Sequence, residues 1–288
     1  MLTDSDSDSD ADHAPALADF LARHPHALVL TGAGLSTASG IPDYRGPDGV
    51  RRGRAPIQGP EFRKSAAVQR RYWARSMVGW PTMAQARPNA GHVALAALEQ
   101  GQRIGSVLTQ NVDGLHQRAG SLSVLELHGN IRTVRCLDCP ATFSRAFIQT
   151  VMSEANPALV QAWASTLAEP APDGDAHIEP DALDQFHAPF CLHCGGTLTP
   201  DVIFFGDNIP PPRTIEALRR MDDADALLVV GSSLMVYSGF RFARSAAASG
   251  KPIAAINFGV TRADHLIALK VAAPAEVILP RVAQLLQA

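Results

Sequence analysis

The chain has 288 residues, enough for one large domain or for a large and a small one, and 46% of them are hydrophobic, which is ample for a buried core. The formal net charge of -3 gives no general attraction to nucleic acid or acidic lipid, and no apolar run approaches membrane-spanning length. The Ser- and Asp-rich residues 1–13 lack the features of a signal or transit peptide. We therefore expect a disordered acidic tail on a cytoplasmic protein.

Residues 14–25 have apolar side chains at helical spacing and predict a helix that covers the first strand. Residues 28–45 begin as an apolar strand and continue into a polar loop with Gly32, Gly34 and Ser36. Glycines let a backbone turn sharply beside a pyrophosphate, and amides at the start of a helix can bind it. Thr37 stands where the usual dinucleotide fingerprint has its third glycine, so the loop is not that of a standard dehydrogenase. Glycine spacing alone supports a plain turn equally well.

All four cysteines occur in two C-x-x-C pairs, which are Cys136, Cys139, Cys191 and Cys194. Two such pairs supply four thiolates to one Zn(II), and with four Cys ligands the metal is structural because no position is open for water. Disulfides or redox motifs are the alternative, but they need an oxidising compartment or an activated thiol, which nothing here indicates. The stretch 140–190 is longer than a simple zinc ribbon needs and predicts an insertion, with a polar loop at 170–180.

The rest of the chain alternates between helical and apolar extended patterns. A Gly-, Pro- and Arg-rich mobile loop is expected at 46–59, and helices at 61–80, 88–98, 212–222, 239–249 and 281–287. Strands are expected at 104–109, 124–129, 200–207, 226–230, 252–256 and 276–279. Polar residues follow the strand at 104–109, and His128 ends the strand at 124–129, although such residues are more often capping or structural groups.

Five apolar strands separated by helices predict a Rossmann-like, doubly wound parallel α/β sheet, with the zinc module inserted as a smaller part. Ligands of such sheets bind at the carboxyl ends of the strands. The polar residues that these ends would bring together are Gly32, Gly34, Ser36, Gln110, Asn111, Asp113, His128, Gly231, Ser232, Ser233 and Asn257. This convergence favours a binding site over a set of unrelated turns.

Several of these motifs occur in order along residues 27–280, and together they resemble the sirtuins. They are GAGLS at 32–36, IPDYR at 41–45, TQNVD at 109–113, HG at 128–129, the two C-x-x-C pairs and GSS at 231–233. The segments at 70–75 and 78–81, with the long insertion, look most like the class II branch, which includes the mitochondrial sirtuin 4 of animals. The resemblance implies an NAD-binding domain made of residues 14–45, 90–131 and 201–288, and a small domain made of 46–89 and 132–200.

The resemblance further implies an NAD-dependent protein-lysine deacylase, with NAD as a co-substrate and one structural Zn(II). The acyl oxygen would attack the ribose carbon as nicotinamide leaves, and His128 would be the general base for a ribose hydroxyl, giving free lysine and O-acyl-ADP-ribose. The implied NAD contacts are Gly32, Ala33, Gly34, Ser36, Asp43, Tyr44, Arg45, Gln110, Asn111, Val112, Asp113, Gly231, Ser232, Ser233, Asn257, Phe258, Gly259 and Ala275. Ile203, Phe204 and Phe205 would contact an acyl-lysine protein or peptide substrate.

Other functions remain open from sequence. Mono-ADP-ribosyl transfer, or removal of a longer acyl group such as lipoyl, would use the same scaffold. Desuccinylation is not expected, because family members that prefer acidic acyl groups have a Tyr and an Arg three residues apart and residues 49–54 offer only the Arg. A non-catalytic NAD-sensing protein would need a basic stripe near the cysteines, where acidic residues also lie. The oligomeric state is not predicted, although a monomer is plausible.

Overall fold

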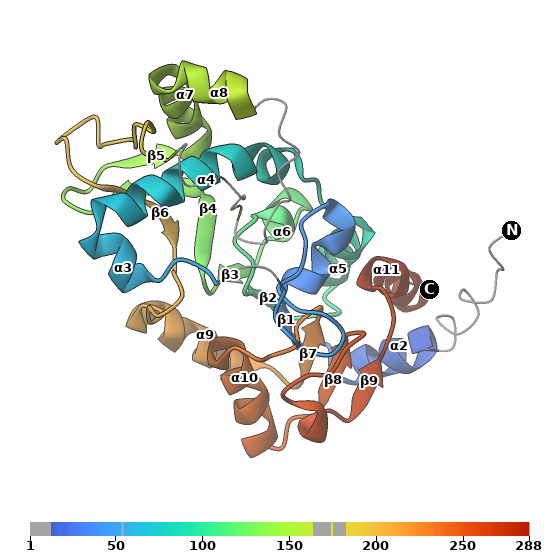
Figure 1. The fold of residues 1–288 in the computed structure, drawn as a ribbon. Coiled ribbons are helices and arrows are strands. Elements are labelled where there is room, and N and C mark those ends of the chain that lie inside the picture. Colours follow the sequence, from blue (N-terminus) through green and yellow to red (C-terminus); the bar gives the residue numbers. More distant parts are fainter. Residues whose placement is uncertain (1–12, 53–54, 164–173, 175–182, 288) are drawn as a thin grey trace, which may run out of the picture.

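The computed structural model describes residues 13–52, 55–163, 174 and 183–287 (Figure 1). The tail expected at 1–13 and the polar loop expected at 170–180 lie almost entirely outside these ranges.

A parallel six-stranded sheet forms the centre of the larger part. Its order is β3-β2-β1-β7-β8-β9, and each neighbouring pair is parallel. The strands are β1 (Leu28–Thr31), β2 (Ser106–Thr109), β3 (Val124–Glu126), β7 (Leu227–Val230), β8 (Ile253–Ile256) and β9 (Leu269–Val271). The chain builds outward from β1 to β3 and then crosses to β7 on the other side of β1. The predicted Rossmann-like α/β class is confirmed, and the crevice between β1 and β7 is the switch point where such sheets bind ligands.

Two helical layers cover the sheet (Figure 1). Val29 and Leu228 belong to the apolar cluster that includes residues of α2 (His13–Arg23), α5 (Ala90–Gln100) and α11 (Ala275–Gln287). Leu30 and Val229 belong to a second cluster, with residues of α9 (Pro211–Asp223) and α10 (Tyr237–Ala248). Successive strand residues point to opposite faces, so a sheet covered on both faces needs strands that are apolar throughout.

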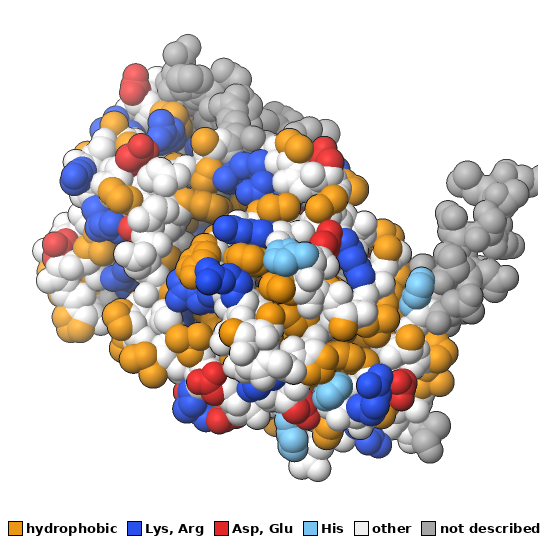
Figure 2. All heavy atoms as spheres, turned by 90° about the horizontal axis from the view of Figure 1, so that it is seen from below, with side chains coloured by type: hydrophobic (Ala, Val, Ile, Leu, Met, Phe, Trp, Pro, Cys, Tyr) orange, Lys and Arg blue, Asp and Glu red, His pale blue; other side chains and the backbone are white. Residues whose placement is uncertain are grey.

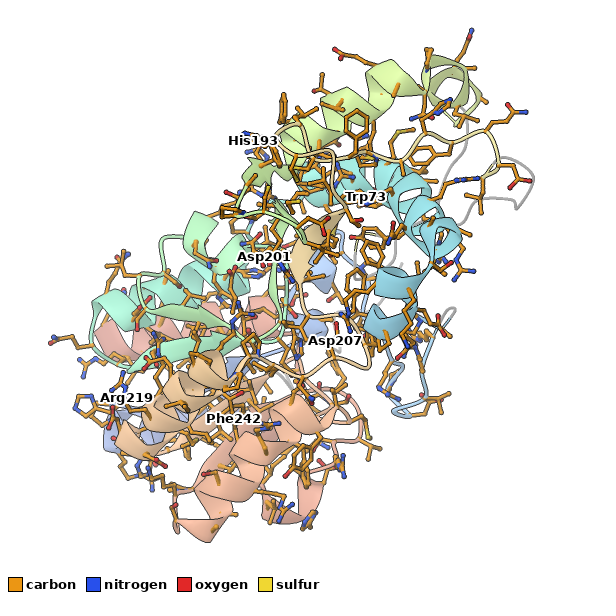
Figure 3. The ribbon with its side chains drawn as sticks, turned by 90° about the vertical axis from the view of Figure 1, so that its left-hand side faces the viewer. Trp73, His193, Asp201, Asp207, Arg219 and Phe242 are labelled. Atoms are coloured by element: carbon orange, nitrogen blue, oxygen red, sulfur yellow. The ribbon has the colours of Figure 1, made fainter. Side chains whose placement is uncertain are left out.

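The smaller part contains an antiparallel sheet of order β5-β4-β6, in which β4 is Gly129–Cys136, β5 is Thr142–Ser144 and β6 is Leu198–Val202. It packs with α3 (Gly59–Lys64), α4 (Ala66–Gln85), α7 (Arg145–Ala155) and α8 (Pro157–Trp163) around a third apolar cluster. Figure 3 shows Trp73 of α4 and His193 in this part, Phe242 of α10 in the larger part, and Asp207 between them. The remaining helix, α6 (Leu115–Arg118), follows β2.

Three sequence predictions of secondary structure were wrong. Residues 276–279 belong to helix α11, because Ile278, Leu279, Val282, Ala283 and Leu286 form one buried helical face that continues past Pro280. The helix predicted at 61–80 is two helices, since the Ser65 hydroxyl accepts a hydrogen bond from Val68 N and begins α4. The strand predicted at 200–207 ends at Val202, and β9 was missed because the exposed Lys270 interrupts its apolar pattern.

The surface carries mixed charge. On the face seen in Figure 2, basic and acidic side chains are interspersed with apolar ones. Near the cysteines, the guanidinium of Arg135 lies 3.5 Å from the carboxylate of Asp201. Within the described part of the chain, none of the helices combines the length and the apolar character required to cross a bilayer.

Candidate active site

Two loops meet at the carboxyl ends of β1 and β7. Gly32 N donates to Val230 O at 3.0 Å, and Gly34 N donates to Gly231 O at 2.9 Å. Gly231 has a φ of +60°, and a Cβ there would collide with the backbone of Gly34 and Leu35. The two loops pack so closely that neither leaves room for a side chain at these positions of the other. The glycines of both motifs are therefore needed for this contact, in addition to any role toward a ligand.

The polar residues after β2 bind this first loop. Asn111 Nδ2 donates to Gly32 O and to Ser36 Oγ, both at 3.1 Å. Ser36 Oγ donates in turn to Asp113 Oδ2 at 2.8 Å, and Asp113 Oδ1 accepts from Leu115 N at 2.9 Å. Burial raises the pKa of Asp113, against the hydrogen bonds from Leu115 and Ser36 that lower it. Asn111, Ser36 and Asp113, which were predicted to contact NAD, thus also hold the loop in place.

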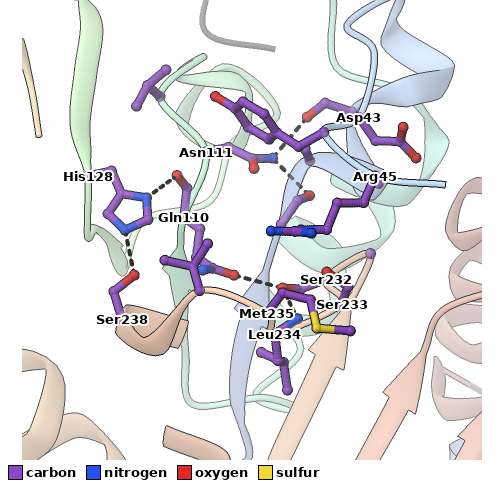
Figure 4. Close-up of a pocket in the computed structure, with 18 of the residues that line it drawn as sticks. Asp43, Arg45, Gln110, Asn111, His128, Ser232, Ser233, Leu234, Met235 and Ser238 are labelled. Atoms are coloured by element: carbon purple, nitrogen blue, oxygen red, sulfur yellow. Dashed lines mark hydrogen bonds between the residues drawn. The ribbon is translucent and has the colours of Figure 1, made fainter. Parts of the chain in front are cut away.

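Gln110 is oriented from the opposite side of the crevice. Ser232 Oγ donates to Gln110 Oε1 at 2.7 Å, and Leu234 N donates to Ser232 Oγ at 3.3 Å (Figure 4). With Oε1 engaged in this way, the two amide protons on Gln110 Nε2 are the groups that the side chain can offer to a ligand.

His128 lies in the turn between β3 and β4, two residues beyond the end of β3. Its Nδ1 is 2.9 Å from the carbonyl oxygen of Gln110, and its Nε2 is 2.9 Å from Ser238 Oγ (Figure 4). A carbonyl oxygen can only accept, so Nδ1 carries the proton and Nε2 has the lone pair, to which Ser238 donates. Burial lowers the pKa of His128, and Arg213 lowers it further, against the hydrogen bond to Gln110. The ring is therefore neutral at pH 7 and can act as a base through Nε2.

Aromatic side chains form another wall. Phe204 stacks on Phe62 with ring centroids 4.9 Å apart, and Phe205 meets Tyr44 edge-on at 6.0 Å. The guanidinium of Arg51 lies 5.0 Å from the Phe205 ring and 5.8 Å from the Tyr44 ring. Ile203 N donates to His128 O at 2.8 Å. The apolar stretch after β6 is thereby fixed beside the histidine.

Most of these groups line one cavity of about 790 Å³, although Phe62 and Leu115 are not part of its lining. Every residue predicted to contact NAD or substrate lines it, as does His128. Asp43 also lies 3.7 Å from Arg52, and burial raises the pKa of its carboxyl against that charge. Sequence reasoning missed Ser238, Arg51 and Arg241, which share the lining. The only signal for Ser238 was its place at the start of the helix that follows β7, which does not reveal contact with a residue 110 positions earlier.

The four cysteines lie together in the smaller part, away from this cavity. Cys136 Sγ is 3.6 Å from Cys194 Sγ and Cys139 Sγ is 3.7 Å from Cys191 Sγ, and all four sulfurs are within 4.8 Å of one another. Ligands about 2.3 Å from a tetrahedral Zn(II) would be roughly 3.8 Å apart, so the cluster fits the metal, and the thiols are free rather than disulfide-bonded. Gly195, with a φ of +74°, makes the turn after Cys194.

Together, the switch-point crevice, the glycine loops and the separate four-cysteine cluster define a nucleotide-binding α/β protein with a structural metal module. Residues 32–238 match the model of the Sir2 family. The chain belongs to the Sir2 family, the sirtuins.

Curated relatives and solved structures agree with this assignment. A "NAD-dependent protein deacetylase" of Xanthomonas campestris pv. campestris (strain 8004) is 52% identical over 257 residues, which cover 89% of this chain and 86% of that protein. A protein of the same name from Bordetella bronchiseptica is 49% identical over 275 residues, covering 96% and 99%. The solved structure "Sir2-p53 peptide-NAD+" has a TM-score of 0.70 and 30% identity, covering 93% of this chain and 96% of that one. The predicted likeness to the class II branch stays a prediction.

Proposed function

We propose that this chain is an NAD-dependent protein-lysine deacetylase that acts on acetylated proteins or peptides. The relatives bear that name, and one solved structure similar to this chain is described as "Sir2 bound to acetylated peptide", with a TM-score of 0.71 and 28% identity. The observation that carries the proposal is the orientation of His128, whose unprotonated Nε2 lies at the cavity that also contains the glycine loops. A neutral imidazole at this position can remove a proton from a bound hydroxyl.

The proposed roles divide between binding and proton transfer. The loops at 32–36 and 231–233 and the residues of the IPDYR motif hold the dinucleotide, with Asn257, Phe258, Gly259 and Ala275 at the adenosine end. When bound, NAD supplies an electrophilic ribose carbon, which accepts the acyl oxygen as nicotinamide leaves. Gln110, Asn111, Val112 and Asp113 orient the nicotinamide ribose, and His128 Nε2 takes the proton of a ribose hydroxyl.

The aromatic wall sets the substrate's position in this proposal. Ile203, Phe204 and Phe205 border the channel for the acyl-lysine side chain. Ile203 N is already hydrogen-bonded to His128 O, and Phe205 O accepts from Gly59 N at 2.9 Å. Hydrogen bonds to a substrate peptide would therefore come from other backbone groups of this stretch. A channel wall of apolar side chains suits an uncharged acyl group.

The test is deacetylation by His128→Ala, with His26→Ala as control because His26 is exposed and outside the cavity. We expect His128→Ala to retain fold and zinc and to lose about 10²- to 10⁴-fold in turnover, while His26→Ala behaves as wild type. Deacetylation by His128→Ala at the wild-type rate would refute the role of His128. Mass spectrometry of the peptide separates the competing activity, since mono-ADP-ribosyl transfer adds ADP-ribose instead of removing the acetyl group.

We further propose the division of the chain made from sequence, with residues 14–45, 90–131 and 201–288 as the NAD-binding domain and 46–89 and 132–200 as the small domain. The two apolar clusters of the parallel sheet and the third cluster around Trp73 support it. The same proposal places the protein in the cytoplasm, without nucleic-acid or membrane partners. The mixed charge on the face seen in Figure 2 supports the absence of these partners.

A further inference from the structure

Two buried histidines that the proposed reaction does not use lie next to each other. His92 on α5 and His116 on α6 are 0% and 1% exposed, and their ring centroids are 5.1 Å apart at an interplanar angle of 61°. Neither lines the cavity. Among the residues that the structure describes, His92 Nε2 and His116 Nδ1 have no hydrogen-bond partner. Buried nitrogens of this kind are costly unless they bond, so the pair needs an explanation.

The position of the proton on His92 follows from its neighbour. Asn89 caps α5, and its backbone N lies 3.4 Å from His92 Nδ1. A backbone N–H only donates, so Nδ1 is unprotonated. The neutral ring then carries its proton on Nε2, which makes this atom a buried donor.

His116 begins a chain of hydroxyl groups. Its Nε2 is 2.9 Å from Thr31 Oγ1, and Thr31 Oγ1 donates to Thr109 Oγ1 at 2.8 Å. Because the Thr31 proton is used in this way, Thr31 accepts from His116 Nε2–H, and His116 Nδ1 is left as an acceptor. The opposite tautomer of His116 would place two buried N–H donors in the pair with no acceptor between them. Donor and acceptor match only when both rings carry their proton on Nε2.

The chain ends at both sides of the glycine loop. Thr109 Oγ1 accepts from Asn111 N at 3.1 Å, and the Asn111 side chain bonds the first loop. At the other end, Asn89 Nδ2 donates to Leu35 O at 2.7 Å and to Ser39 Oγ at 3.0 Å. The two histidines therefore lie between two segments that hold the same loop.

We propose that His92 and His116 act as a neutral pair, with a proton on His92 Nε2 beside the ring whose Nδ1 has a lone pair, that positions Asn111 for NAD through Thr31 and Thr109. The NAD part of this inference rests on the proposed function. Burial independently keeps both rings uncharged, since it lowers the pKa of His92 to about 4 and that of His116 to about 3. Both histidines are positioning residues, because they act on a ligand contact through other groups.

The first test determines, in the protein without NAD, which ring nitrogens of the two histidines are protonated. Long-range ¹H–¹⁵N NMR of the imidazoles at pH 7, assigned with His92→Gln and His116→Gln, should show protonated Nε2 and unprotonated Nδ1 in both rings. His92→Gln should shift the Nδ1 resonance of His116, whereas His26→Gln should leave it in place. A protonated Nδ1 on His116, or a His116 resonance that ignores the change at His92, would overturn the pair.

The second test breaks the chain at a hydroxyl. Thr31→Val removes both buried hydrogen bonds of the Thr31 hydroxyl, those to Thr109 and His116, with little change of shape. We expect NAD affinity measured by calorimetry to fall about fivefold or more. Thr31→Ser should restore it, and the control Thr150→Val, at an exposed position of α7, should have no effect. Affinity for an acetylated peptide should stay within about twofold of wild type, which a general loss of structure would not allow.

Each result has a defined meaning. Wild-type NAD affinity in Thr31→Val would refute the positioning role. If the wild-type protein binds no NAD, the proposed function fails instead, and the NMR result still decides whether the histidine pair exists.

Discussion

Acid should destabilise this protein steeply through the buried histidine pair. An unfolded histidine has a pKa near 6.5, whereas burial holds those of His92 and His116 at about 4 and about 3. A lowered pKa in the folded state means that protons bind preferentially to the unfolded chain, so the free energy of unfolding falls as the pH drops below 6.5. Between pH 7.5 and pH 5.0 the two rings together should remove about 4 kcal/mol.

The slope of the free energy of unfolding against pH tests this reasoning more directly than the total loss. Near pH 5.5 each unfolded ring holds about 0.9 proton and each folded ring almost none, so each should contribute about 1.2 kcal/mol per pH unit. Urea unfolding at several pH values measures it, and His116→Gln should reduce the slope by that amount whatever it does to stability at pH 7.5. The lowered pKa of His128 adds a slope of the same sign, which cancels in the comparison.

The control is His26→Gln, because His26 is exposed. It should leave the slope at the wild-type value. A slope in His116→Gln equal to that of the wild type would show that the ring is not held neutral by burial, and the reasoning about the pair would fail.

Three other predictions follow from the site. Gly231→Ala should lower the free energy of unfolding, measured by urea titration, by about 2 kcal/mol or more, and should weaken NAD binding. Gly250→Ala is the control, because Gly250 has a φ of +67° but open space around it; its free energy of unfolding should fall only by the cost of backbone strain, about 1 kcal/mol. A chelator should remove one zinc ion per chain, as counted by elemental analysis, and the fluorescence spectrum should then show Trp73 of the third cluster exposed to solvent. Unchanged fluorescence in the metal-free protein would contradict a structural site. The pH–rate profile should keep its plateau below pH 6.5, because the pKa of His128 is lowered and the base form persists there; an acid limb above pH 6.5 would contradict this.

The sequence predicted the parts of the fold that depend on local pattern. The strands at 28–31 and 227–230 are buried throughout and apolar except for Thr31, because both faces of the sheet are covered, and this pattern is visible without a structure. The cysteine spacing likewise predicted one cluster, since two identical pairs have few other uses. Helix α11 was mistaken for a strand because Val277 and Ile278 are β-branched and Pro280 suggests a break, whereas burial of the whole face decides for helix.

Contacts between distant residues could not be predicted. Ser238 reaches His128 only because β7 and the turn after β3 end at the same rim of the sheet. His92 and His116 meet because α5 and α6 pack together, and no spacing between them signals it. The glycines of two motifs proved to depend on each other, which a single motif does not reveal.

The central claim is NAD-dependent deacetylation, and product stoichiometry tests it most directly. Wild-type protein should be incubated with NAD and an acetyl-lysine peptide, and the products quantified by mass spectrometry. We predict nicotinamide, free-lysine peptide and O-acetyl-ADP-ribose in equal amounts, with no deacetylation when NAD is left out. Free acetate formed without NAD, or a peptide that keeps its acetyl group and gains ADP-ribose, would contradict the account.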